Sequence, residues 1–311
     1  KSLIINFIGN GWPELLKQDF ISSLVTPVIK INKRSEILSF YNLNDYNEWK
    51  KTNKVSSNSV KYYKGLGTST SSEAKEYFKN MKLLNYKTSG KEDSDYLELA
   101  FTKSDADKRK KWILDNIKNP ETLDYNKNMV KIKDLINKEL VLFSIEDNKR
   151  SLPNLIDGLK PSQRKIIFGC IKKNITTEIK VSQLSGYISE HTSYHHGEVS
   201  LMETIINLAQ NFVGSNNINL LEPIGQFGTR LLGGKDSSSP RYIYTKLSGQ
   251  FNELFNPEDF ELLDYLNDDG ISIEPKFYVP ILPTILTPLC ICLSLVREKI
   301  NSPVKRRKRN K

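Results

Sequence analysis

One glycine-rich segment places a nucleophile and a cation side by side. It runs from Pro223 through Gly228 and Gly234 to Arg241 and Tyr242. A tyrosine hydroxyl attacks slowly at neutral pH, because its pKa is about 10. A neighbouring guanidinium stays charged and stabilises both a phenolate and a phosphate, while glycines let backbone N–H groups approach phosphate oxygens. The segment therefore predicts a phosphodiester held against Tyr242.

The residues alone leave other interpretations of this region open. A glycine-rich β-hairpin in which Tyr242 is an ordinary strand residue has the same pattern. Tyr244 is a rival nucleophile, because it would face the same side of a strand as Tyr242. His191 and His195 have the i,i+4 spacing of a metal pair, but no further ligands converge in the sequence, so we predict no metal site.

The composition indicates a globular protein with a polyanionic partner. The 311 residues carry a formal net charge of +10, which favours nucleic acid, and they are enough for two domains. No apolar run reaches the roughly 20 residues of a membrane span. Three cysteines match no disulfide framework or zinc spacing and suit a reducing compartment. Because the chain begins with Lys1 rather than methionine, we expect a segment of a longer protein.

In the first half of the chain the patterns predict mixed helices and strands. Residues 25–31 and 37–41 are β-rich. Thr70 and Glu73 form a capping box that begins a helix reaching to about Leu84. Residues 86–95 are predicted to form a loop, and residues 100–117 a charged helix. From residue 132 to 143 the apolar residues, Phe143 included, keep helical spacing.

The second half predicts three helices followed by a hairpin. Pro161 suits the first turn of a helix that buries Ile166 and Cys170 and carries Arg164 and Lys165 on its surface. Further helices are expected over residues 180–190 and 197–212. Strand-like residues 220–221 and 242–247 flank the glycine segment. This order is typical of a winged helix-turn-helix, a common DNA-docking module.

Four blocks of sequence, taken together, resemble a known family. They are Lys61 to Thr68 (KYYKGLGT), Arg150 to Lys165 (RSLPN…DGLKPSQRK), Tyr194 to Glu198 (YHHGE), and Pro223 to Tyr242. In this order they resemble the central part of a eukaryotic-type type IIA DNA topoisomerase, from about residue 3 to residue 286.

The resemblance implies an α+β architecture in four parts. Residues 1–125 would be the C-terminal part of a TOPRIM α/β layer and a connector. Residues 126–265 would be the winged-helix cleavage domain, residues 266–286 the start of an α/β tower domain, and residues 287–311 a divergent basic tail. The tail is interpreted either as a nuclear localisation or DNA-contacting signal or as a gene-model error.

The resemblance also implies a reaction, namely reversible double-strand DNA cleavage. Tyr242 would attack a backbone phosphate and form a 5′-phosphotyrosyl bond. Arg241 would hold the scissile phosphate, and Arg150 and His196 match the family's other positions around it.

Five further cations are expected to bind DNA. Lys160, Arg164 and Lys165 match a segment that lies against DNA in the family, and Lys64 and Lys235 belong to the two glycine-rich turns. Phosphate neutralisation of this kind provides affinity rather than sequence choice. The alternative for any one of them is a solvated surface residue.

Cofactors and partners follow from the resemblance alone. The family uses Mg²⁺, whose ligands would lie upstream of this chain, and full-length members also use ATP. Double-stranded DNA is the expected partner, a homodimer the expected assembly of the full-length protein, and the nucleus the expected location. The alternative function is a catalytically inactive, truncated paralogue that binds DNA without cutting it.

Overall fold

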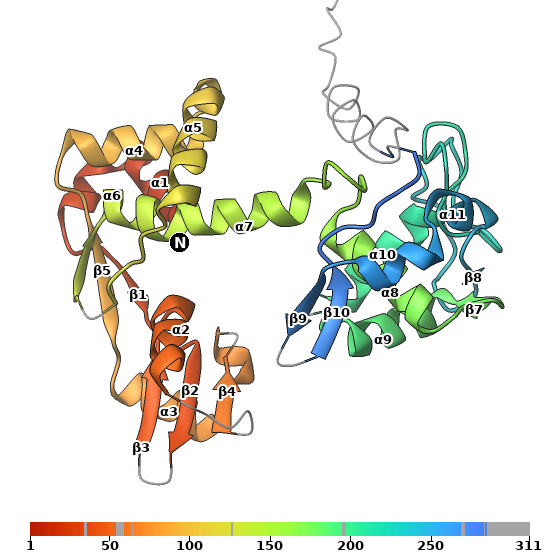
Figure 1. Cartoon of the computed structure of the whole chain (residues 1–311). Coiled ribbons are helices and arrows are strands. Elements are labelled where there is room, and N and C mark those ends of the chain that lie inside the picture. The colour runs from red at the N-terminus through yellow and green to blue at the C-terminus, as the bar shows by residue number, and fades with distance from the viewer. Residues whose placement is uncertain are drawn as a thin grey trace, which may run out of the picture. The chain divides into compact units, whose positions relative to one another are not determined.

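The chain forms two compact units of mixed helices and small sheets (Figure 1). The computed structural model describes residues 1–33, 36–53, 59–63, 65–125, 127–194, 197–268, 271–282 and 284. Unit 1 comprises residues 1–147 and unit 2 residues 148–311, so the predicted boundary at 125/126 falls inside unit 1. The α+β class is confirmed. Within the described part of the chain, none of the helices has both the length and the apolarity of a membrane span.

One sheet of unit 1 lies against a helical layer. Its order is β1 (Ile21–Leu24), β5 (Leu83–Lys87), β6 (Met129–Lys131), with β1 antiparallel and β6 parallel to β5. The helical elements of this part are α1 (Ser2–Gly11), η1 (Pro13–Lys17), α4 (Lys91–Phe101), η4 (Lys103–Asp105) and α5 (Ala106–Lys118). Leu84 and Tyr86 of β5 are buried together with Ile5 of α1. The loop predicted over residues 86–95 is therefore wrong, because β5 ends and α4 begins within it.

A second sheet of unit 1 has its own small core. It is antiparallel, in the order β3 (Glu36–Phe40), β2 (Ile29–Lys33), β4 (Val60–Tyr62). Ile29 and Ile31 of the central strand are buried against Tyr46 of α2 (Leu43–Thr52). The two β-rich segments predicted from the sequence thus form neighbouring strands.

A capping box fixes the start of α3 (Ser71–Lys79), as predicted. The Thr70 N–H donates to Glu73 Oε2 at 2.7 Å, and the Glu73 N–H donates to Thr70 Oγ1 at 3.3 Å. The helix ends at Lys79 rather than near Leu84, because Leu83 begins β5. Between β4 and α3 the chain forms the short turn η3 (Gly65–Thr68).

The Glu73 carboxylate also contacts β4 and the residue that follows this strand. It accepts a hydrogen bond from the Tyr63 hydroxyl and lies 3.0 Å from Lys61 Nζ. The Tyr63 hydroxyl, followed by the Thr70 N–H, lowers the pKa of Glu73 to about 2. One carboxylate therefore joins the start of the KYYKGLGT segment to the N-terminus of α3.

The connection into unit 2 is helical. α6 (Ile132–Leu135) continues through a π-helical turn, η5 (Ile136–Leu140), into α7 (Val141–Ser151). Ile132, Leu135 and Ile136 are buried as their spacing predicted, but Phe143 is 62% exposed. Phe143 therefore lies off the buried face, which continues in α7 through Val141 and Ile145.

Unit 2 contains the predicted helices and a short ladder. They are α8 (Pro161–Lys172), β7 (Ile179–Lys180), α9 (Val181–His191), α10 (Glu198–Ala209) and β8 (Tyr244–Thr245), with β7 antiparallel to β8. Each helix contributes buried residues to a common core, for example Ile166 of α8, Leu184 of α9 and Ile205 of α10. The three helices thus follow the predicted order, but the ladder differs from the predicted hairpin, because β7 lies between α8 and α9. In the described residues, the two segments of that hairpin meet in the isolated bridges Leu221–Leu247 and Ile224–Tyr244.

A second core in unit 2 joins the start of α8 to the last described elements. These are α11 (Gly249–Leu254), η6 (Pro257–Leu262), β9 (Tyr265–Asp268) and β10 (Ile271–Pro275). Leu159, Phe251, Phe255 and Tyr278 are buried in it. The chain after β10 therefore packs back on the segment that precedes α8.

A buried ion pair lies at this junction. Asp157 accepts two hydrogen bonds from the Arg164 guanidinium, Nε at 2.7 Å and Nη2 at 2.9 Å. It also accepts from the Leu159 N–H at 2.9 Å and the Tyr278 N–H at 3.0 Å. The Asp157 and Arg164 side chains are 0% and 6% exposed.

We expect Asp157→Asn to lower the free energy of unfolding of unit 2 by about 3–5 kcal/mol, because it leaves the buried Arg164 charge unpaired. The measurement is urea unfolding followed by a probe in unit 2. The matched control is Asp264→Asn, which removes an exposed pair with Lys276 and is expected to cost less than about 1 kcal/mol. Equal losses in the two variants would contradict this expectation.

Glu73 predicts an acid-dependent contribution to stability. Its pKa is about 2 in the folded chain against an ordinary 4.5, so the contribution is complete above pH 4.5 and is lost as the pH falls towards 2. The difference in unfolding free energy between wild type and Glu73→Gln should shrink over that window. Glu48→Gln, at an exposed position, is the control and should show no such change. A difference that stays constant from pH 6 to pH 2 would refute the assignment.

Candidate functional site

Arg241 and Tyr242 lie in a turn, with both side chains on the surface. The Tyr242 N–H donates to the Ser239 carbonyl at 2.9 Å, and the Tyr242 side chain is 76% exposed. The next residue, Ile243, is 1% exposed and belongs to the core of the three helices. The Tyr242 phenol is therefore exposed to solvent, while the next residue along the chain is buried in the core.

The start of α9 holds this turn from both sides. The Val181 N–H donates to the Ile243 carbonyl and the Ser182 N–H donates to the Pro240 carbonyl, each at 3.1 Å. The first N–H groups of a helix have no partner within it, so carbonyls that flank the turn satisfy two of them. The Arg241–Tyr242 dipeptide is thereby fixed to the N-terminus of a helix.

The two candidate tyrosines are in different environments. The expectation that both lie on one strand is wrong, because the strand begins only at Tyr244. Tyr244 is half-buried and pairs with Lys180 across the β7–β8 ladder. The Lys180 ammonium lies 5.9 Å from the centre of its ring. Exposure therefore favours Tyr242 over Tyr244 as the nucleophile.

The glycine loop, residues 225–238, closes on itself before it reaches the turn. Asp236 accepts from the Thr229 N–H and from the Thr229 hydroxyl, both at 2.8 Å, and the first of these bonds is the main cause of the lowered pKa of Asp236. The loop presents Arg230 and Lys235 as exposed cations. A hollow of about 760 Å³ lies between the loop and α10, and it is lined by Glu203, Ile206, Asn207, Arg230, Leu231, Leu232, Gly233, Gly234, Lys235 and Ser237.

The cations at the start of α8 do not all reach the surface. Arg164 is 5% exposed and its guanidinium binds Asp157, so the expectation that it lies on the DNA-facing surface is wrong. Lys165 is largely buried, with its ammonium 2.8 Å from Glu274 Oε2 and donating to the Thr192 carbonyl. Lys160 is half-buried at the N-cap of α8. The sequence could not separate these three, because their partners are set by the fold.

The other predicted site residues fall on separate elements. Arg150 is exposed in the last turn of α7. His196 and Lys64 lie outside the described residues, as does the tail after residue 284. Lys180 was missed by the sequence analysis, since only the β7–β8 pairing brings it beside the turn, some 60 positions away in sequence.

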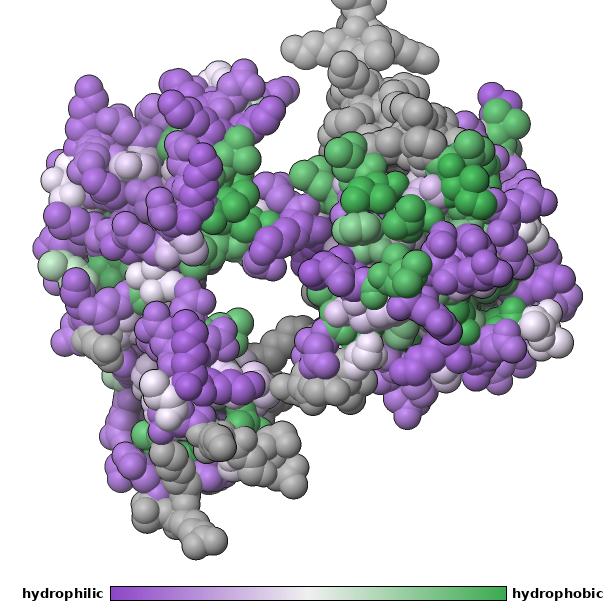
Figure 2. Space-filling model, in the orientation of Figure 1, coloured by the Kyte–Doolittle hydropathy of each residue, from purple (hydrophilic) through white to green (hydrophobic). Residues whose placement is uncertain are grey.

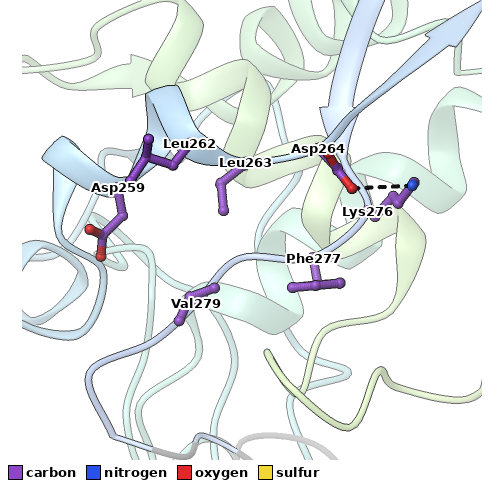
Figure 3. Close-up of a pocket in the computed structure, with 7 residues that line it drawn as sticks. All are labelled: Asp259, Leu262, Leu263, Asp264, Lys276, Phe277 and Val279. Atoms are coloured by element: carbon purple, nitrogen blue, oxygen red, sulfur yellow. Dashed lines mark hydrogen bonds and ion pairs between the residues drawn. The ribbon is translucent and has the colours of Figure 1, made fainter.

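Unit 2 also carries another hollow, with apolar and charged lining residues (Figure 3). It measures about 430 Å³ and is lined by Asp259, Leu262, Leu263, Asp264, Lys276, Phe277 and Val279. Asp264 and Lys276 form an ion pair at its rim, with 3.3 Å between the charged atoms. Figure 2 shows hydrophobic side chains on the viewed face of unit 2. The exposed apolar residues of unit 2 include Leu262, Val279 and Ile281. Of the predicted catalytic residues that the structure describes, namely Arg150, Arg241 and Tyr242, none lines this hollow.

The described residues offer no cluster of three or more His, Cys, Asp or Glu side chains that could hold a metal ion. The described candidate residues offer a phenol, guanidinium groups and ammonium groups.

Comparison with known proteins accounts for most of the chain. Residues 24–148 match the family model of the C-terminal associated domain of TOPRIM, and residues 150–288 match a family model of DNA gyrase/topoisomerase IV. DNA topoisomerase 2-alpha of Rattus norvegicus is 52% identical over 300 residues, and DNA topoisomerase 2 of Drosophila melanogaster is also 52% identical. Both alignments cover 92% of this chain, and the chain spans about a fifth of the length of these relatives.

A solved structure agrees with the sequence relatives. The DNA-binding, cleavage and re-ligation domain of Plasmodium falciparum topoisomerase II superposes with a TM-score of 0.74 at 48% identity, covering 92% of this chain and 39% of that one. Both family models occur here in one chain, in the order that the four sequence blocks predicted. The chain belongs to the eukaryotic-type type II DNA topoisomerase family.

Proposed function

We propose that this chain is the DNA cleavage and religation part of a type II DNA topoisomerase, with Tyr242 as the nucleophile. The observation that carries the proposal is the exposed Tyr242–Arg241 turn fixed to the start of α9. A nucleophile must reach a phosphate on a large polymer, so it has to stand on the surface while its backbone stays in place. The family membership supports the same assignment.

The reaction is an exchange of phosphodiester bonds. The Tyr242 oxygen forms a bond to phosphorus while the bond from phosphorus to the 3′ oxygen of the preceding nucleotide breaks. The phenol loses a proton, and the departing 3′ oxygen gains one. A phosphodiester to tyrosine replaces the phosphodiester of the DNA strand, so the 3′ hydroxyl can attack again and restore the strand.

Arg241 and the loop cations stabilise charge in this exchange. The guanidinium of Arg241, the residue before the nucleophile, would neutralise the non-bridging phosphate oxygens on which negative charge builds up. Arg230 and Lys235 stand exposed on the glycine loop and suit neighbouring phosphates. Arg150 and His196 stay proposals for the same phosphate, on the resemblance.

The remaining parts of the proposal concern the longer protein. Mg²⁺ would stabilise the attacking and leaving oxygens when held by ligands outside this chain. ATP use, homodimerisation and a nuclear location are proposed from the family alone. The formal charge of +10 supports duplex DNA as the partner.

The decisive test uses a chimaera in which residues 1–284 replace the matching residues of rat DNA topoisomerase 2-alpha. With supercoiled plasmid and Mg²⁺, followed by denaturant and protease, we expect linear DNA with a 5′-linked peptide. Tyr242→Phe should abolish this product because it removes the nucleophilic oxygen, and Arg241→Ala should lower it about 10²–10³-fold.

Tyr244→Phe is the matched control and should leave cleavage within about threefold of wild type, an order-of-magnitude margin for a group outside the reaction. Cleavage that survives Tyr242→Phe would overturn the assignment. DNA binding without linear product from any version would favour the alternative of a DNA-binding module that has lost cleavage.

Lys235 predicts a salt-dependent contribution to DNA binding. Lys235→Ala should weaken duplex binding several-fold and reduce the slope of log K against log salt by about 1, because one phosphate contact is lost. The measurement is fluorescence anisotropy of this chain over a salt series. Lys165→Met is the control and should keep the slope, because the Lys165 ammonium is held by Glu274. A changed slope for Lys165→Met alone would reverse the roles assigned here.

A further inference from the structure

A buried glutamine at the end of α10 binds both arms of the glycine loop. Gln210 is 5% exposed, and its Nε2 donates to the Phe227 carbonyl at 2.8 Å and to the Gly234 carbonyl at 3.2 Å. A primary amide carries two N–H hydrogens, so one side chain satisfies both acceptors. These carbonyls belong to the chain entering the loop and the chain leaving it.

The two arms are in contact with no room for a side chain between them. Gly228 has a φ of +100°, and a Cβ added there would lie 2.6 Å from the Gly234 Cα. Gly234 has a φ of +79°, and a Cβ there would lie 2.3 Å from Gln210 Nε2. Both positions therefore require glycine by backbone angle and by space. The glycines allow the close approach, and the glutamine amide holds it.

A series of backbone bonds leads from this junction to the nucleophile. The Gly234 N–H donates to the Thr229 carbonyl at 2.9 Å, and the Ser238 N–H donates to the Gln226 carbonyl at 2.9 Å. The next residue, Ser239, supplies the carbonyl that accepts from the Tyr242 N–H. The base of the loop and the turn that carries Tyr242 are thus joined by short, consecutive hydrogen bonds.

We propose that Gln210 is a positioning residue for DNA cleavage. By holding the two arms of the glycine loop, it sets the place of the loop cations and of Tyr242 relative to the scissile phosphate. It makes no contact with the reacting atoms itself. This inference rests on the function proposed for Tyr242, and its test separates the two.

The test compares Gln210→Met, which keeps the length and volume of the side chain and removes both donors, with wild type. Gln250→Met, at an exposed position on α11, is the matched control. In the chimaera, cleavage should fall about 10- to 100-fold, because a displacement of the order of 1 Å is enough for such a loss. Duplex affinity should change less than about threefold, since the loop cations remain.

Hydrogen exchange of this chain provides a readout that does not depend on activity. The amides of Gly233, Gly234 and Ser238 should exchange faster in Gln210→Met, while those of α8 and α9 keep their protection. The melting temperature of each variant is measured first, and all assays are run below the lowest of these temperatures.

Each outcome either supports or contradicts the positioning role of Gln210. Faster loop exchange together with slower cleavage at unchanged affinity supports the positioning role. Unchanged loop exchange, or faster loop exchange with wild-type cleavage, overturns it, and so does exchange that rises throughout unit 2. If no version of the chimaera cleaves DNA, the proposed function fails and the cleavage role of Gln210 fails with it, while loop exchange still reports whether Gln210 orders the loop.

Discussion

The buried carboxylate of Asp157 is the interaction on which unit 2 depends. It accepts four hydrogen bonds, two from Arg164, one from the Leu159 N–H and one from the Tyr278 N–H. Residues 157 and 278 are far apart in sequence, so this one group closes the unit by joining the approach to α8 with the chain after β10. A buried charge is tolerated only when it is paired and its other lone pairs are satisfied. Here both conditions are met.

This closure has a consequence for the site. α8 packs against α9 and α10 in the core of the three helices, and the start of α9 binds the carbonyls on either side of Arg241 and Tyr242. The end of α10 supplies Gln210 to the glycine loop. The exposed residues of the candidate site therefore stand on the packed core of three helices. Such support is what a nucleophile needs if it is to meet a large, rigid substrate in one orientation.

Five basic residues of unit 2 differ in charge partner and exposure. Arg164 and Lys165 have carboxylate partners and stabilise the fold, whereas Arg230, Lys235 and Arg241 are exposed. The cations of the 150–165 block and those of the glycine segment thus have different surroundings. A basic motif in a DNA-binding family is partly a folding motif, and the buried carboxylates Asp157 and Glu274 identify which of its members serve the fold.

The sequence by itself determined the family, the α+β class, the capping box at Thr70 and the starts of α8 and α9. These depend on local patterns and on blocks of residues in a fixed order. Both can be recognised in the sequence without knowledge of the fold. Only the tertiary structure decided that Arg164 is buried, that Tyr242 stands in a turn while Tyr244 is half-buried in a ladder, and that Gln210 reaches the glycine loop. Each of these depends on a partner between 7 and more than 60 residues away in sequence, such as Asp157 for Arg164 or Lys180 for Tyr244. Periodicity indicates which face of a helix or strand is buried. Which side chain of another element contacts that face is decided only when the elements pack together.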